Sequence, residues 1–87
     1  MARIEMEGAG MAPNAAQTDE FFFELGLTYA TGRDGTTDLV AAHKWFNLAA
    51  IKGNREAARF REEIAGELSP LERAEALRLA REWIRLH

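Results

Sequence analysis

The sequence predicts an all-α domain, more specifically a short right-handed α/α solenoid of four antiparallel helices. Four segments carry apolar residues at helical spacing, and each is bounded by residue types that begin or end helices. Several of these positions also recur at a fixed offset along the chain, which is typical of stacked helix pairs. We expect the helices at residues 19–31, 38–52, 55–68 and 70–86.

The first expected helix has a signal at each end. Thr18 or Asp19 can serve as its N-cap, and the acids Asp19 and Glu20 lie in the first turn, where the helix dipole favours negative charge. Gly32 suits the left-handed conformation that ends many helices. The apolar face of this helix comprises Phe22, Leu25, Gly26 and Tyr29, and we expect Gly26 to permit a close approach by a neighbour.

The second and third expected helices meet at Gly53 and Asn54, which we expect to end one helix and to cap the next. Thr37 or Asp38 can cap the second helix. Its apolar face comprises Leu39, Ala42, Phe46 and Ala49, with Trp45 beside it. The apolar face of the third helix comprises Ala57, Phe60, Ile64 and Leu68.

The fourth expected helix has the strongest start signal in the chain. Ser69 stands at the N-cap, Pro70 at the first helical position, where no N–H is needed, and Glu72 completes a capping box. The face that we expect this helix to bury comprises Leu71, Ala74, Leu77, Ala80 and Ile84, with Trp83 beside it.

The second and fourth helices share three apolar positions at an offset of 38 residues. The matching pairs are Leu39 with Leu77, Ala42 with Ala80, and Trp45 with Trp83. In a paired-helix solenoid each unit buries its apolar face against the next unit. This offset therefore predicts one such unit and part of a second.

Residues 21–53 contain a Leu-Gly pair, a Tyr, a Gly and an Asp, followed by the motif Ala-x-x-Trp-Phe-x-x-Ala-Ala-x-x-Gly. In this pattern the chain resembles one nearly complete unit of the SEL-like repeat family, which is related to tetratricopeptide repeats. The residues that match are Leu25, Gly26, Tyr29, Gly32, Asp38, Ala42, Trp45, Phe46, Ala49, Ala50 and Gly53.

The chain departs from the family pattern on either side of this unit. Phe21 stands where the family has a small Ala, and Arg61 and Glu62 replace the Leu-Gly pair of a second unit that keeps Ala57. The second unit therefore resembles a polar C-terminal cap. The resemblance implies a scaffold or adaptor that binds other proteins, commonly through the concave face lined by the first helix of each pair.

Composition limits the classes of function. The 87 residues fit one domain, in which we expect residues 1–17 to be disordered, with Met11 as an alternative start. The net charge of −3 disfavours nucleic acid as a partner, because phosphate-binding surfaces are usually basic. Cysteine, a secretory signal and a membrane-spanning run are all missing from the sequence, so we expect the protein in the cytoplasm.

The sequence offers little for catalysis. His43 and His87 lack a carboxylate at the spacing of a metal-binding motif, and we expect His43 to be a surface residue. Capping explains Ser69, and a turn between helices explains the glycines of residues 32–35 better than a phosphate cradle does. We therefore expect no catalytic, cofactor-binding or metal-binding residue and no enzymatic activity.

Apolar residues beyond those needed for packing indicate an interface. In the first helix Phe21, Phe23 and Leu27 either complete a small core or form an exposed edge. The same two possibilities apply to Leu79 and Leu86 in the fourth helix. We expect a partner protein, for which a second copy in a homodimer is one candidate. The residues expected to contact it are Phe21, Phe23, Glu24, Leu27 and Thr28.

Three further hypotheses remain at this point. One face of the fourth helix carries Arg78, Arg81 and Arg85 among the acids Glu75 and Glu82, which favours a solvated face, with docking of an acidic partner as the alternative. A small enzyme or metabolite-binding domain would have a cavity with converging polar groups and would depend on His43. A fragment of a longer solenoid would turn Phe21 toward a missing unit.

Overall fold

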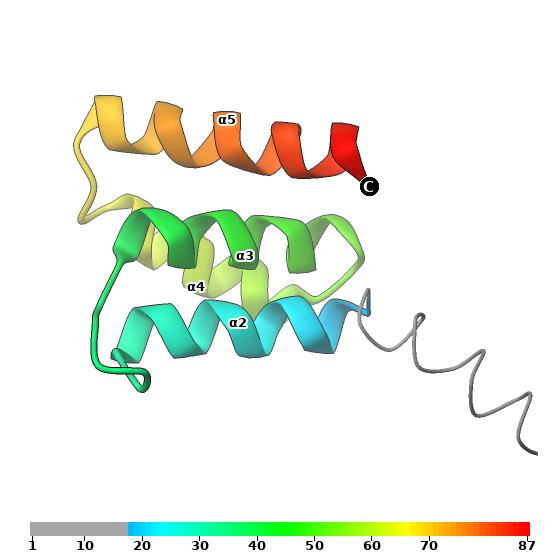
Figure 1. Ribbon diagram of the computed structural model, residues 1–87, viewed down its shortest axis with the longest axis horizontal. Coiled ribbons are helices and arrows are strands. Elements are labelled where there is room, and N and C mark those ends of the chain that lie inside the picture. Colours follow the sequence, from blue (N-terminus) through cyan, green and yellow to red (C-terminus); the bar gives the residue numbers. More distant parts are fainter. Residues whose placement is uncertain (1–17) are drawn as a thin grey trace, which may run out of the picture.

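The computed structural model describes residues 18–87, and the expected disorder of residues 1–17 lies outside this range. The described chain forms four helices without a strand, so the all-α class is confirmed (Figure 1). The helices are α2 (Asp19–Thr31), α3 (Leu39–Ile51), α4 (Arg55–Ala65) and α5 (Pro70–Leu86). The second and third helices are shorter than expected, most clearly α4, which ends three residues before Leu68.

Local side-chain chemistry fixes where the helices begin. The four N-caps are Thr18, Asp38, Asn54 and Ser69, and the side chain of each accepts a hydrogen bond from a backbone N–H in the first turn. The predicted capping box is present, because the N–H of Glu72 donates to Ser69 Oγ at 3.1 Å and the N–H of Ser69 donates to Glu72 Oε1 at 2.8 Å. Gly32 ends α2 in the left-handed conformation, with φ of 74°.

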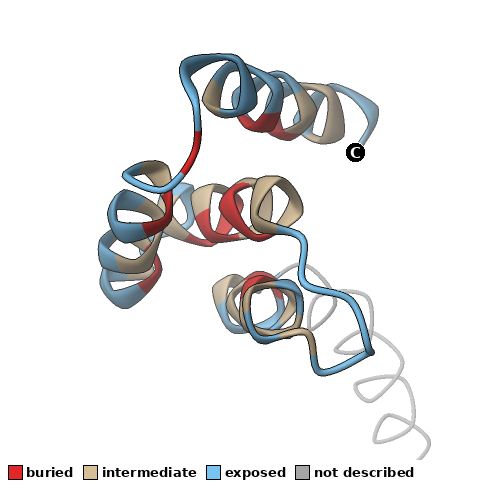
Figure 2. Ribbon diagram, turned by 90° about the vertical axis from the view of Figure 1, so that its left-hand side faces the viewer, coloured by how far each residue is buried: buried red, intermediate tan, exposed pale blue. Residues whose placement is uncertain are grey.

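Helix α3 is the centre of the fold. It packs closely against α2, α4 and α5, whereas the other pairs of described helices approach one another only at isolated points. Figure 2 shows α3 between α2 and α5, with α4 on a third side. A second helix pair of a solenoid would join α4 to α5. Here α5 lies on α3 instead.

Two phenylalanines form the middle of the core. Phe22 of α2 and Phe46 of α3 are fully buried, and the ring of Phe46 lies against Gly26, so α2 and α3 approach closely as the glycine predicted. Phe60 of α4 stacks on Phe46 with ring centroids 5.5 Å apart, and Phe23 of α2 contacts both rings. The remaining buried core residues are Ala42, Leu48, Ala49, Ala57, Ile64, Leu68 and Ala80.

The prediction for the buried face of α5 was largely wrong. Of its five residues only Ala80 is buried, and Leu71, Leu77 and Ile84 are 83%, 40% and 49% exposed. The helix instead turns Ala76, Ala80 and Trp83 inward. Residues three apart differ in direction by about 60° around a helix. A set spaced mostly by three residues therefore does not stay on one side of the helix. Small side chains at 76 and 80 let α5 lie close to α3, which decides the face.

An arginine explains why α4 ends early. The guanidinium of Arg73 in α5 donates hydrogen bonds to the carbonyls of Ala65 at 3.0 Å and Leu68 at 2.8 Å. These bonds satisfy backbone acceptors that a longer helix would have left to water. Leu68 is buried although it lies in the connecting loop. The loop thus anchors the start of α5.

Candidate interaction surface

Large apolar side chains are exposed on α5 and at the end of α3. Leu77, Ile84 and Leu86 are all exposed, and Ile51 at the last position of α3 is 60% exposed. A recess of about 420 Å³ lies between the ends of these two helices. The residues that line it are Ile51, Lys52, Trp83, Ile84 and His87. We refer to these five residues as the α3–α5 recess.

The α3–α5 recess combines an apolar floor with positive charge. Trp83 contacts the buried Phe22 on one side, with ring centroids 5.1 Å apart, and stacks on His87 on the other at 4.1 Å. The exposed Lys52 stands at its edge and makes no ion pair with a described residue. Such a recess can take an apolar side chain whose neighbours are acidic.

The arginines of α5 differ in how well they are neutralised. Arg78 is held by Glu75 at 2.8 Å and by Glu82 at 3.3 Å, and its hydrogen bond lowers the pKa of the Glu75 carboxyl. Arg85 approaches Glu82 only to 3.6 Å, and Arg81 makes no ion pair within residues 18–87. The face is thus not simply a balanced, solvated surface. Its C-terminal half has uncompensated positive charge.

The five expected partner contacts in α2 do not form one surface. Phe21 is 39% exposed and Glu24 is exposed, whereas Thr28 is half-buried. Phe23 and Leu27 turn the other way and pack on the core, where the Phe23 ring lies 5.7 Å from Phe46. Of the two interpretations of the three consecutive phenylalanines, core packing fits Phe22 and Phe23. Phe21 is the one that remains at the surface.

The expectation of a surface His43 was wrong. Its side chain is 4% exposed, and its Nδ1 atom has no hydrogen-bond partner among the residues that the structure describes. Burial lowers the pKa of His43 from its ordinary value near 6.5, and the nearby Arg61 guanidinium lowers it further. Glu62 opposes this shift and Arg73 adds to it. The sequence does hold a signal for this burial, because α3 carries apolar residues on nearly all sides, which is typical of a helix enclosed by neighbours.

Comparisons of the chain with protein-family models, with curated proteins and with solved structures found no match. Within the part of the chain that the structure describes, no three His, Cys, Asp or Glu side chains are grouped so that they could hold a metal ion. None of the helices in residues 18–87 combines the length and the apolar character needed to cross a membrane.

Proposed function

We propose that this protein is a non-catalytic protein–protein interaction module, a small scaffold or adaptor that works in the cytoplasm. The observation that carries the proposal is the exposure of Leu77, Ile84 and Leu86 on α5 and of Ile51 on α3, of which Ile51 and Ile84 line the α3–α5 recess. Burying one such side chain contributes about 1.5–3 kcal/mol, so a partner that covers several of them gains enough to bind. Contiguous exposed apolar side chains with a polar border are typical of interfaces.

The SEL-like resemblance supports the same proposal. Its motif residues Gly26 and Phe46 pack α2 against α3, and Trp45 and Trp83, which are matched at the 38-residue offset, both contact Phe22. A relation to SEL-like repeats would make the outer faces of the terminal helices the natural places for a further protein to stack. We extend the contact surface to the exposed residues Phe21 and Glu24 of α2 on this ground.

A helical enzyme or metabolite-binding domain gains no support from the site. That hypothesis needs converging polar groups in a cavity, with His43 among them. The α3–α5 recess is lined by other residues, and His43 lies inside the packing of α3. The interaction module accounts for the exposed apolar residues, which the enzyme would leave unexplained.

Photocrosslinking in growing cells tests the proposal. The full chain carries a photoreactive benzoylphenylalanine at position 84 or, as a control, at position 63 on the exposed side of α4. We expect a crosslinked product of defined mass from position 84 and none from position 63. Equal products from both positions, or none from either, would contradict an interface at α5.

A further inference from the structure

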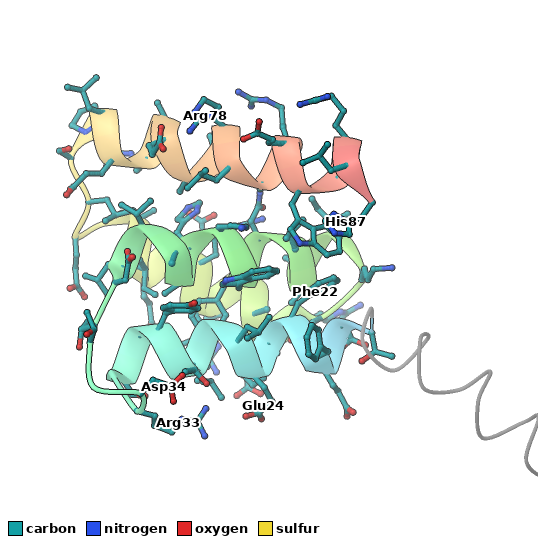
Figure 3. All side chains as sticks on the ribbon, viewed as in Figure 1. Phe22, Glu24, Arg33, Asp34, Arg78 and His87 are labelled. Atoms are coloured by element: carbon teal, nitrogen blue, oxygen red, sulfur yellow. The ribbon has the colours of Figure 1, made fainter. Side chains whose placement is uncertain are left out.

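The outer faces of α2 and α5 carry opposite charge. Helix α2 contains the acids Asp19, Glu20 and Glu24 and no basic residue. Helix α5 contains four arginines against three acids, and three of the arginines line a recess of about 330 Å³ along its surface. Figure 3 shows Glu24 on the outer side of α2 and Arg78 on the outer side of α5, so the two faces point away from each other across α3.

The acidic turns of α2 and the basic turns of α5 lie at the same end of the molecule. Figure 1 shows that α2 begins where α5 ends, so the two helices run antiparallel on either side of α3. The contact of Phe22 with Trp83 at 5.1 Å fixes this alignment, because one lies in the first turns of α2 and the other in the last turns of α5. The acids of the α2 face and the arginines of the α5 face therefore lie at the same level along the helix axes.

The charges on both faces are available to a partner. Glu20 is exposed and makes no ion pair with any residue in the described range, and the same holds for Arg81. Glu24 is paired with Arg33 at 3.3 Å, but both side chains are more than half exposed, so this pair contributes little and can be exchanged. Arg85 has only a long contact with Glu82.

We propose that the α5 face of one copy binds the α2 face of the next copy, head to tail. This inference rests on the proposed function and names the partner as a second copy of the chain. When one copy is translated, without rotation, along the direction that runs from α2 through α3 to α5, its Glu20 and Glu24 lie over the α5 helix of the neighbouring copy. They face the turns that hold Arg81 and Arg85. The exposed ring of Phe21 then meets the apolar side chains of the same helix.

Charge disfavours the symmetric alternatives. Two α5 faces would bring arginines together, and two α2 faces would bring acids together, and like charges across an interface are costly. A head-to-tail contact is heterologous, so each added copy leaves one α2 face and one α5 face free. The assembly therefore grows past a dimer as concentration rises, and it weakens as salt screens the charges.

Charge reversal in the full chain tests this contact. One variant carries Arg81→Glu with Arg85→Glu, a second carries Glu20→Lys with Glu24→Lys, and a third carries all four changes. A control variant reverses the pair Arg59→Glu with Glu63→Lys on α4, where the two side chains are exposed. Sedimentation equilibrium over a hundredfold range of concentration, at low and high salt, gives the mass relative to the 9.7 kDa chain.

We expect the wild type and the α4 control to grow with concentration at low salt, and each two-site variant to associate about tenfold more weakly or not at all. The four-site variant should regain association, because its acids now lie on α5 and its bases on α2. A wild type that stays at one chain mass, or a natively folded four-site variant that stays monomeric, overturns the proposal. If position 84 still crosslinks to another protein in that case, the interaction module stands and only self-association fails.

Discussion

The ring of Phe46 in α3 lies so close to Gly26 in α2 that a Cβ atom on Gly26 would fall 2.5 Å from Cδ1 of that ring. Carbon atoms that are not linked by bonds do not approach so closely, so the structure would have to shift. Phe46 is fully buried and cannot swing aside into solvent. The distance between α2 and α3 therefore depends on the missing side chain at position 26.

Replacing Gly26 with alanine should destabilise the protein although alanine favours helices. The better helix propensity contributes about 1 kcal/mol, whereas overpacking a filled core costs about 1–3 kcal/mol. We expect a net loss of about 1 kcal/mol in the free energy of unfolding, measured by urea denaturation. The control is Gly66→Ala, where the nearest atom would lie at 3.4 Å, an ordinary contact. Equal stability of the two variants would show that α2 and α3 are not this close.

Removing the indole of Trp83 should free α5 before the rest of the fold opens. Among the described helices α5 packs closely only against α3, and Trp83 is its one aromatic side chain, in contact with Phe22 and Trp45. Losing a tryptophan from a core costs about 3–5 kcal/mol, and we expect the lower end because Trp83 is partly exposed.

Native-state hydrogen exchange of the Trp83→Ala variant measures this effect. The amides of α5 should lose protection while those of α2 and α3 keep most of theirs, since segments with few neighbours open locally. The control is Leu71→Ala, at a position that is 83% exposed on the same helix. Uniform loss of protection across all helices would mean that α5 opens only with the whole domain.

Acidification should weaken the fold through His43. The unfolded chain binds a proton on this residue near pH 6.5, whereas the folded chain does so only at lower pH, because burial lowers the pKa. The proton therefore favours the unfolded state, and stability falls as the pH drops through 6.5 and below. One such group changes the free energy of unfolding by at most about 1.4 kcal/mol per pH unit.

The variant His43→Leu isolates this contribution. Leucine fills the site with an apolar side chain of similar size, and it removes the Nδ1 atom, which has no partner among the described residues. Urea denaturation from pH 8 to pH 5 should show a smaller pH dependence for the variant than for the wild type. Identical slopes would mean that His43 takes up its proton equally in both states.

The sequence predicted best what is encoded locally. Thr18, Asp38, Asn54 and Ser69 bond to their own helices, so the helix starts follow from a few adjacent residues. The close approach at Gly26 was also predicted, because a glycine amid large apolar residues needs a neighbour to explain it. These features depend on short stretches of chain.

The sequence failed where the answer depends on which helices become neighbours. The buried side of α5 is set by its packing on α3, and from sequence spacing alone Leu77 and Ile84 fit a buried stripe as well as Ala76 and Trp83 do. His43 is buried because three helices surround α3, a fact of the whole fold. The surface that we propose for a partner was missed for the same reason, since it includes residues of α5 that were expected to be inside.

The proposed interaction surface depends on which side of α5 faces the solvent, and thiol labelling measures this orientation directly. The chain contains no cysteine, so Ile84→Cys, Leu77→Cys and Ala80→Cys each place one reporter on the helix. At low concentration and high salt, we predict rapid modification by a small aromatic disulfide at positions 84 and 77, and at least about a hundredfold slower modification at the buried position 80. Protection at positions 84 and 77 with rapid modification at position 80 would contradict the account, because α5 would then bury the very face that we assign to a partner.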